Sequence, residues 1–329
     1  MLSIVIITIG IALLFNFLNG MNDAANSIAT VVSTKVLSPL AAVIWAAFFN
    51  FAAVFFFGVS VATTIGTGIV DPSVINEFIV LAALIGSVIW TYGCTHIGLP
   101  ISVSHALIGG LIGPALMAGG TGVLISSGLI KVALFIVLSP IIGLLLGYLL
   151  MILTMLVFRR QAPMKVDHLF RGLQLLSSAV FSFGHGTNDA QKTMGIIAVL
   201  LFSTGRIGPE FYVPFWVIIS SYSAISLGTL FGGWKVIKTL GLSLTNLKPV
   251  HGFCAETAGA ITIIGSSLAG IPVSTTHTIT GSIMGVGMTR RLSAVRWGVV
   301  GKITLAWVLT IPGTMAISAG AYYVISLFL

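Results

Sequence analysis

Charged residues are what this sequence has least of. Only 7% of its 329 residues are Asp, Glu, Lys or Arg, whereas 57% are hydrophobic and the mean hydropathy is +1.13. A soluble domain of this size needs a charged surface that so few residues cannot build. Long apolar stretches with short connections instead predict a single integral membrane unit, surrounded by the lipid bilayer.

Cysteine is scarce too, since Cys94 and Cys254 are the only two and both lie in apolar stretches. We expect them to be packing residues, because neither a disulfide nor a metal site is indicated. The net charge of +8 does not predict nucleic-acid binding, because most basic residues fall in short loops that face anionic lipid. The first eighteen residues lack a basic start and a cleavage site, so they are expected to form a spanning helix rather than a signal peptide.

The hydropathy pattern predicts ten spanning helices, because a hydrocarbon core about 30 Å thick needs about 20 apolar residues per helix. The Gly-, Ser- and Pro-rich stretches 98–120 and 270–288 are apolar yet broken, which indicates re-entrant hairpins. The predicted fold is therefore all-α, with about 10 spanning helices plus two re-entrant hairpins, or 12 if the hairpins are counted as spans. The expected spans are 2–19, 22–36, 39–61, 74–96, 127–157, 170–185, 188–204, 211–233, 250–268 and 297–325.

Five crossings per half is an odd number, so the second half is predicted to enter the membrane upside down. The expected division is a first repeat over 1–158, a cytoplasmic linker over 159–169 and a second repeat over 170–329. With this linker inside, eight basic residues are expected on the inner side and four on the outer side, which obeys the positive-inside rule. Both termini are then predicted to be extracellular. The inner set is Arg159, Arg160, Lys165, Arg171, Arg206, Arg290, Arg291 and Arg296, and the outer set is Lys35, Lys235, Lys238 and Lys248.

Two sequence phrases occur once in each half. Residues 20–26 read GMNDAAN and residues 186–192 read GTNDAQK, while residues 98–105 read GLPISVSH and residues 270–277 read GIPVSTTH. Each phrase puts helix-breaking and hydrogen-bonding residues into apolar surroundings. In membrane proteins, paired interruptions of this kind are typical of a transport site between two repeats.

Asp23 and Asp189 lie in the first phrase, and a carboxylate inside a spanning segment indicates function. The preceding glycines predict that a helix restarts near residues 22 and 188, where its free N–H groups and dipole would attract an anion. The carboxylates would attract a cation. An anion and a cation at one place indicate coupled transport, so the predicted fold is that of an inverted-repeat secondary transporter. Simple helix capping is the alternative, and the duplication at membrane depth disfavours it.

The hairpin phrases supply hydroxyl groups that could surround a tetrahedral oxyanion. Ordinary helix packing is the alternative reading of these side chains, and the duplicated spacing favours binding. Lys192 is expected either to contact the anion or to pair with an acid. The hydroxyl residues are Ser102, Ser104, Ser274, Thr275 and Thr276.

His105 and His277 recur at matching places, where they could relay protons or bond a neighbouring carbonyl. His96, His185 and His251 are expected to be structural. Glu256 is a third intramembrane acid, and polar Asn50 lies in a comparable helix of the first half. We assign Asp23, Asn26, Asn50, Asp189 and Glu256 to cation coupling.

The duplicated phrases resemble those of the PiT inorganic phosphate transporter family over nearly the whole chain. The resemblance implies secondary transport of phosphate driven by Na⁺ or H⁺, an inverted-repeat fold and homodimers. It also implies that Asn22, Asp23, Asn188 and Asp189, with the hairpin hydroxyls, hold phosphate and cations, including Na⁺ at the two aspartates if coupling is to sodium. The segments that carry the resemblance are Gly20–Ser27, Gly98–Gly109, Ser182–Gly195, Gly232–Gly241, Gly252–Glu256 and Gly270–Gly287.

Two features bear on the subtype. Residues 184–192 are similar to bacterial low-affinity members, which are often proton-coupled, and Asn50 stands where animal relatives carry a glutamate. Some short bacterial members are similar to sulfate permeases. We therefore predict cation-coupled phosphate symport across the cell membrane by alternating access, with sulfate as the alternative substrate and a metal–phosphate complex as an alternative cargo.

Importing a dianion against 100 mV costs about 4.6 kcal/mol, which two co-transported cations would cancel. No cofactor is expected beyond these ions. A passive anion channel and an intramembrane aspartyl enzyme are the alternatives from other classes. A channel is disfavoured because acids beside an anion pathway need cations to be useful. An enzyme is disfavoured because these aspartates lie in Asn-Asp phrases beside hydroxyl-rich hairpins. The protein is predicted not to be an enzyme.

Overall fold

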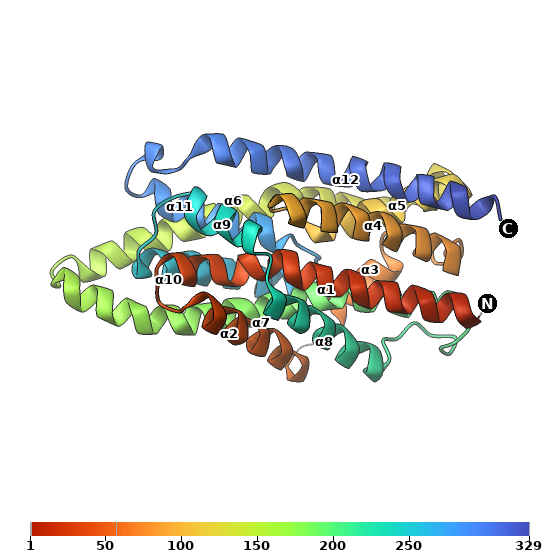
Figure 1. The fold of residues 1–329 in the computed structure, drawn as a ribbon, viewed down its shortest axis with the longest axis horizontal. Coiled ribbons are helices and arrows are strands. Elements are labelled where there is room, and N and C mark those ends of the chain that lie inside the picture. The colour runs from red at the N-terminus through yellow and green to blue at the C-terminus, as the bar shows by residue number, and fades with distance from the viewer. Residues whose placement is uncertain (1, 57, 329) are drawn as a thin grey trace.

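The computed structural model describes residues 2–56 and 58–328, and its regular structure is helical (Figure 1). Helices suit this composition because, in lipid, a helix satisfies its own backbone hydrogen bonds. The first half contains α1 (Leu2–Ser33), α2 (Pro39–Ala52), η1 (Ala53–Phe55), α3 (Ser60–Thr67), α4 (Glu77–Ile97), α5 (Val103–Gly119), η2 (Thr121–Val123) and α6 (Ser126–Phe158). The second half contains α7 (Pro163–Ser203), α8 (Phe215–Phe231), α9 (Trp234–Ser243), α10 (Pro249–Leu268), α11 (Thr275–Met288), η3 (Leu292–Ala294) and α12 (Trp297–Ser326).

The two halves repeat one order of elements. Each begins with a long helix, α1 or α7, and continues with a sharply bent pair, α2–α3 at 85° or α8–α9 at 74°. Two helices joined by a hairpin tip come next. They are α4 and α5 in the first half, and α10 and α11 in the second. A 3₁₀ turn and a long helix, α6 or α12, close each half.

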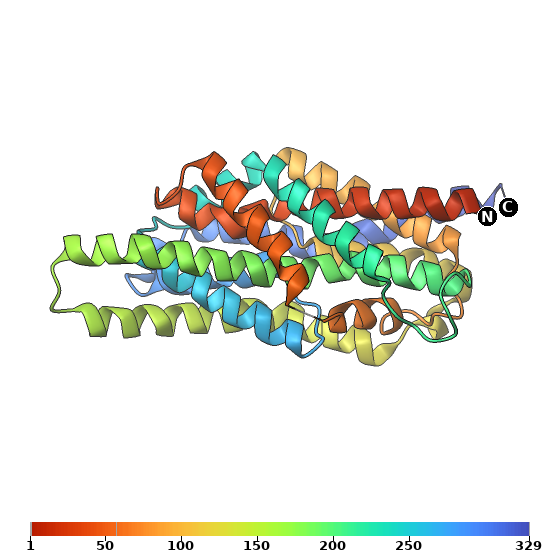
Figure 2. The ribbon, with the colours of Figure 1, turned by 90° about the horizontal axis from the view of Figure 1, so that it is seen from below.

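The halves start from opposite ends of the molecule. Both chain termini lie at one end, and the loop between α6 and α7 projects from the other (Figure 1). Figure 2 shows the same separation after a quarter turn, with α1 and α7 running in opposite directions. This arrangement agrees with an odd number of crossings in each half.

The predicted breaks near residues 22 and 188 are wrong, because α1 and α7 continue through them as single helices of 32 and 41 residues. The glycines of the phrase serve close packing instead. A Cβ on Gly20 would lie 2.0 Å from the carbonyl oxygen of Ile225, and a Cβ on Gly186 would lie 2.5 Å from that of Asn50. The two aspartates therefore project from the middle of helices.

The continuous helices α1 and α7 also each replace two of the ten predicted spans. Within the described residues, four helices are long and apolar enough to span a membrane, or six if each bent pair counts as one. These are α1, α4, α6 and α12. The sequence predicts neither of the short helices α3 and α9, because 62–73 and 234–249 fall between the expected spans.

The two hairpin tips have matching structures. Gly98 and Gly270 adopt φ values of +80° and +67°, which a residue without a Cβ tolerates best, and a short extended segment then leads into α5 or α11. Thr239 of α9 donates a hydrogen bond to the Gly98 oxygen at 3.0 Å. Thr64 of α3 donates to the Gly270 oxygen at 2.8 Å. The unpredicted short helices thus hold the tips in place.

The structure corrects the predicted number of basic residues on each side of the membrane. Lys35 and Lys248, expected opposite the linker, line the same cavity as Arg171 and Pro163 at the linker end. The expectation failed because α1 and α7 were each counted as two crossings, which moved Lys35 after α1 and Lys248 beyond α7 to the wrong side. The linker end of the molecule is therefore richer in basic residues than the sequence suggested.

Candidate functional site

A cluster of three buried ionisable side chains lies where the long helices of the two halves cross. Asp23 comes from α1, and His185 and Asp189 come from successive turns of α7. The His185 Nε2 atom lies 3.2 Å from Asp189 Oδ2 and 3.9 Å from Asp23 Oδ2. One ligand atom from each residue lies within 4.8 Å of the others, which is close enough to hold one metal ion. Carboxylates with an imidazole are a donor set typical of transition metals.

His185 corrects the sequence analysis, which assigned it a structural role. Its Nδ1 atom lies 3.2 Å from Asn50 Oδ1, while Asn50 Nδ2 donates to Thr229 at 3.0 Å. The Asn50 oxygen accepts the Nδ1 proton, so Nε2 points at the two carboxylates. The spacing of His185 and Asp189, four residues apart on one helix, was the sequence signal for this pair.

The tip of the second hairpin contacts both aspartates. The Thr275 hydroxyl lies 3.4 Å from Asp23 Oδ2 and 3.3 Å from Asp189 Oδ2, and Thr276 lies 3.3 Å from Asp23 Oδ1. Asn26 donates to both hydroxyls, at 3.3 Å and 3.0 Å. Two of the predicted hairpin hydroxyls therefore meet the predicted acids, and the four residues are buried together.

Lys192 pairs with an acid, which is one of the two roles expected for it. Its ammonium lies 2.5 Å from Asp189 Oδ1 and 2.9 Å from the main-chain oxygen of Val273, and it also contacts the Ser104 hydroxyl. Because Ser104 belongs to the first hairpin and Val273 to the second, Lys192 joins the two tips. Its side chain is only 2% exposed.

Ser102 and Ser274 cap the helices that follow the two tips. Each hydroxyl accepts a hydrogen bond from a backbone N–H three residues later, at 3.3 Å from His105 and 3.2 Å from His277. The helix N-termini expected at residues 22 and 188 are thus found at the starts of α5 and α11, beside the acidic cluster. Their positive dipole ends suit an anion.

The two repeated histidines touch each other. The rings of His105 and His277 have centroids 4.7 Å apart, and Trp307 stacks on His277 at 3.7 Å. The Nδ1 atom of His277 also lies 3.4 Å from the Ile136 oxygen. This carbonyl contact is one of the two roles left open by the sequence, and a proton relay stays a prediction.

Asn22 and Asn188 make equivalent contacts in the two halves. Asn22 donates to Thr95 of α4 at 2.8 Å, and Asn188 donates to Ser267 of α10 at 2.9 Å. Their amide N–H groups are engaged, whereas their buried Oδ1 atoms have no hydrogen-bond partner among the described residues. An unengaged carbonyl oxygen suits a cation or a P–OH proton better than a phosphate oxygen.

Glu256 lies in a separate buried polar cluster. Its carboxylate accepts hydrogen bonds from Thr30 at 2.6 Å, Gln174 at 3.0 Å and Ser177 at 2.5 Å. Asn50 contacts His185 instead, and it lies on α2, whereas the element order makes α4 the counterpart of α10. Glu256 and Asn50, both assigned to cation coupling, therefore belong to different places in the protein.

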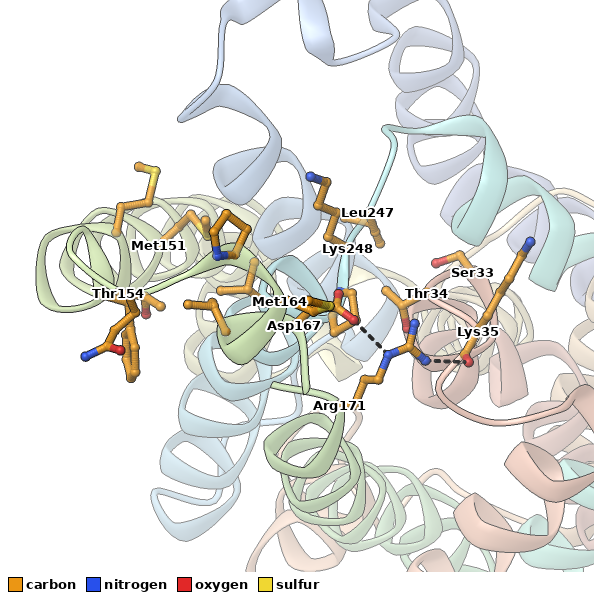
Figure 3. Close-up of a pocket in the computed structure, with 17 residues that line it drawn as sticks. Ser33, Thr34, Lys35, Met151, Thr154, Met164, Asp167, Arg171, Leu247 and Lys248 are labelled. Carbon is orange, nitrogen blue, oxygen red and sulfur yellow. Dashed lines mark hydrogen bonds and ion pairs between the residues drawn. The ribbon is translucent and has the colours of Figure 1, made fainter. Parts of the chain in front are cut away.

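A cavity of about 820 Å³ lies next to the Glu256 cluster, at the linker end. Thr34 lines it and donates a 2.9 Å hydrogen bond to Gln174, which in turn bonds Glu256. Figure 3 shows Thr34 beside Arg171, whose guanidinium bridges Asp167 and the Lys35 oxygen. One buried glutamine thus separates Glu256 from this cavity.

Comparison with known proteins adds independent findings. A family model described as "Phosphate transporter family" matches residues 19–318. A "Probable low-affinity inorganic phosphate transporter" of Rhizobium meliloti is 56% identical, over 96% of this chain and 94% of the relative. A protein of the same description from Bacillus subtilis is 40% identical, over 99% and 98%. A solved structure titled "The sodium-dependent phosphate transporter" superposes with a TM-score of 0.92 at 28% identity, over 99% of this chain and 100% of the other.

Proposed function

Because this chain belongs to the phosphate transporter family, a family of membrane transporters and not of enzymes, we propose that it carries inorganic phosphate together with a cation by alternating access. The observation behind the proposal is the buried meeting of Asp23, His185 and Asp189 with the hydroxyl tip of the second hairpin. Lys192 balances only one of the two carboxylates, so a bound cation would balance the other and the cluster could then accept an anion.

The two helix N-termini provide the anion-binding part of this proposal. The starts of α5 and α11 lie beside the cluster, and an oxyanion between them would be stabilised by their N–H groups. Phosphate bound there would lie against Ser104, Thr275 and Thr276, next to the cation at the aspartates. The attraction between the two ions then makes each increase the affinity of the other.

The two halves act as inverted repeats in this proposal. They repeat one order of elements and start from opposite ends of the molecule, so a movement that opens the site to one side has an inverted counterpart that opens it to the other. The positive-inside rule favours a cytoplasmic linker end, where Arg159, Arg160, Arg171, Lys35 and Lys248 gather. Both termini would then be extracellular. The homodimer stays a prediction.

Uptake of ³²P-phosphate by the purified protein in liposomes tests the function. We expect accumulation driven by a Na⁺ or a proton gradient, and no inhibition by excess sulfate. Sulfate uptake without phosphate uptake would move the substrate to sulfate while leaving the mechanism in place. Flux that persists without any cation gradient, at rates beyond a carrier's turnover, would contradict coupled transport and favour a channel.

A further inference from the structure

The environment of the Lys192 ammonium is that of a bound metal cation. Its three contacts are a carboxylate oxygen of Asp189, the hydroxyl oxygen of Ser104 and the main-chain oxygen of Val273. All three ligands are oxygens, and Val273 belongs to a hairpin tip where the helix is interrupted. Hard cations choose oxygen ligands, and transporters bind Na⁺ through the carbonyl groups of such unwound segments.

The equivalent position in the first half carries no charge. Asn26 and Lys192 both occupy the last place of the repeated phrase, GMNDAAN and GTNDAQK. Asn26 donates to Thr275 and Thr276, which reach Asp23, so it lies beside its own aspartate as Lys192 lies beside Asp189. The Asn26 Oδ1 atom is buried and has no hydrogen-bond partner among the described residues. An acceptor oxygen with no donor, next to a carboxylate, suits a cation.

We propose that Lys192 is a built-in cation that occupies, in the second half, the place that a co-transported ion takes in the first half. The proposal rests on the cation-coupled transport described above and specifies its ion sites. The three N–H donors of the ammonium match the three oxygens, so none of these three is free for a further ion, while Asp189 Oδ2 faces His185 and Thr275 instead. A mobile cation binds at Asp23 and Asn26, and the three-oxygen site around Asp189 Oδ1, Ser104 and Val273 is closed to Na⁺.

Replacing Lys192 with the residue of the first half provides the test. Lys192→Asn removes the ammonium from the oxygens of Asp189, Ser104 and Val273, and the introduced amide supplies a fourth oxygen ligand. We expect this variant to bind one more ²²Na⁺ per chain than the wild-type protein in equilibrium dialysis. The matched control is Lys302→Asn, which removes an exposed lysine of α12 and should leave the amount of bound sodium unchanged.

Equal sodium binding by the wild-type protein and a folded Lys192→Asn variant would overturn the proposal. A second comparison applies if Lys192→Asn does not fold, as judged by size-exclusion chromatography. Lys192→Gln, which removes the charge but keeps most of the side-chain length, should then bind one more sodium ion per chain than the wild-type protein, and unchanged sodium binding in a folded Lys192→Gln variant would contradict the proposal. Absence of phosphate uptake by the wild-type protein would refute the proposed function and leave the sodium measurement interpretable.

Discussion

Asp23 has no lysine of its own, unlike Asp189. Its carboxylate contacts the hydroxyls of Thr275 and Thr276, and the His185 ring lies 3.9 Å away. A buried carboxylate with mainly neutral donors is stabilised when a cation binds beside it. This is why we place the mobile ion at Asp23.

Asp23→Asn therefore tests the cluster at the residue scale. The amide keeps the size of the side chain but removes its charge, so we expect the protein to fold and phosphate uptake to fall at least about tenfold, or about 1.4 kcal/mol. Liposome uptake and size-exclusion chromatography measure the two effects. Asp71→Asn is the matched control, since Asp71 is exposed in the loop before α4. Ion-dependent uptake near the wild-type rate in Asp23→Asn would refute the assignment.

At the scale of the elements, small residues allow the two halves to interlock. α1 of the first half packs closely on α8 of the second through Gly20, whose α-carbon faces the Ile225 carbonyl, and α7 packs on α2 through Gly186. Lipid-embedded helices have no hydrophobic drive to associate, so close backbone approach is what stabilises such pairs.

Gly20→Ala should therefore destabilise the protein, whereas Gly10→Ala on the same helix should not. A Cβ on Gly20 would lie 2.0 Å from a backbone oxygen, but a Cβ on Gly10 has nothing within 4 Å. Forced repacking costs about 1–3 kcal/mol, so we expect a Tm several degrees lower for Gly20→Ala in detergent. Equal Tm values for the two variants would show that this helix contact is not close in solution.

At the scale of the whole molecule, the linker and the α7–α8 loop lie at opposite ends (Figure 2). Gln161 and Glu210 are exposed in these two loops, while the native Cys94 and Cys254 are buried. In intact cells, a membrane-impermeant maleimide should label Glu210→Cys and leave Gln161→Cys unlabelled until the membrane is permeabilised. The reverse pattern would place the linker outside and refute the proposed orientation.

Much of the architecture could be predicted because it depends on local composition and on repetition. Apolar composition predicts membrane helices, and the duplicated phrases predicted two related halves with matching hairpins. Asp23 and Asp189 were identified because charge is costly inside a bilayer, and Thr275 and Thr276 because the hairpin phrase repeats. In the structure, Thr275 contacts both aspartates and Thr276 contacts Asp23.

Other features depended on contacts between distant segments, which no local pattern contains. A glycine can interrupt a helix or allow another helix to pack closely against it, and the sequence around the glycine does not distinguish the two. The role of Gly20 is clear only in the structure, where α1 continues past it and the Ile225 carbonyl packs against it. His185 was assigned a structural role because its significance depends on Asp23, which belongs to the other half.

Residue types alone are enough to predict a duplicated, all-helical membrane transporter with two intramembrane aspartates, because hydropathy, repetition and the cost of buried charge depend on residue type. The groups that surround those aspartates follow instead from helix packing. Packing brings Lys192 to oxygens of both hairpins and Asn26 to Thr275 and Thr276, since these residues lie far apart along the chain and meet only in the folded protein.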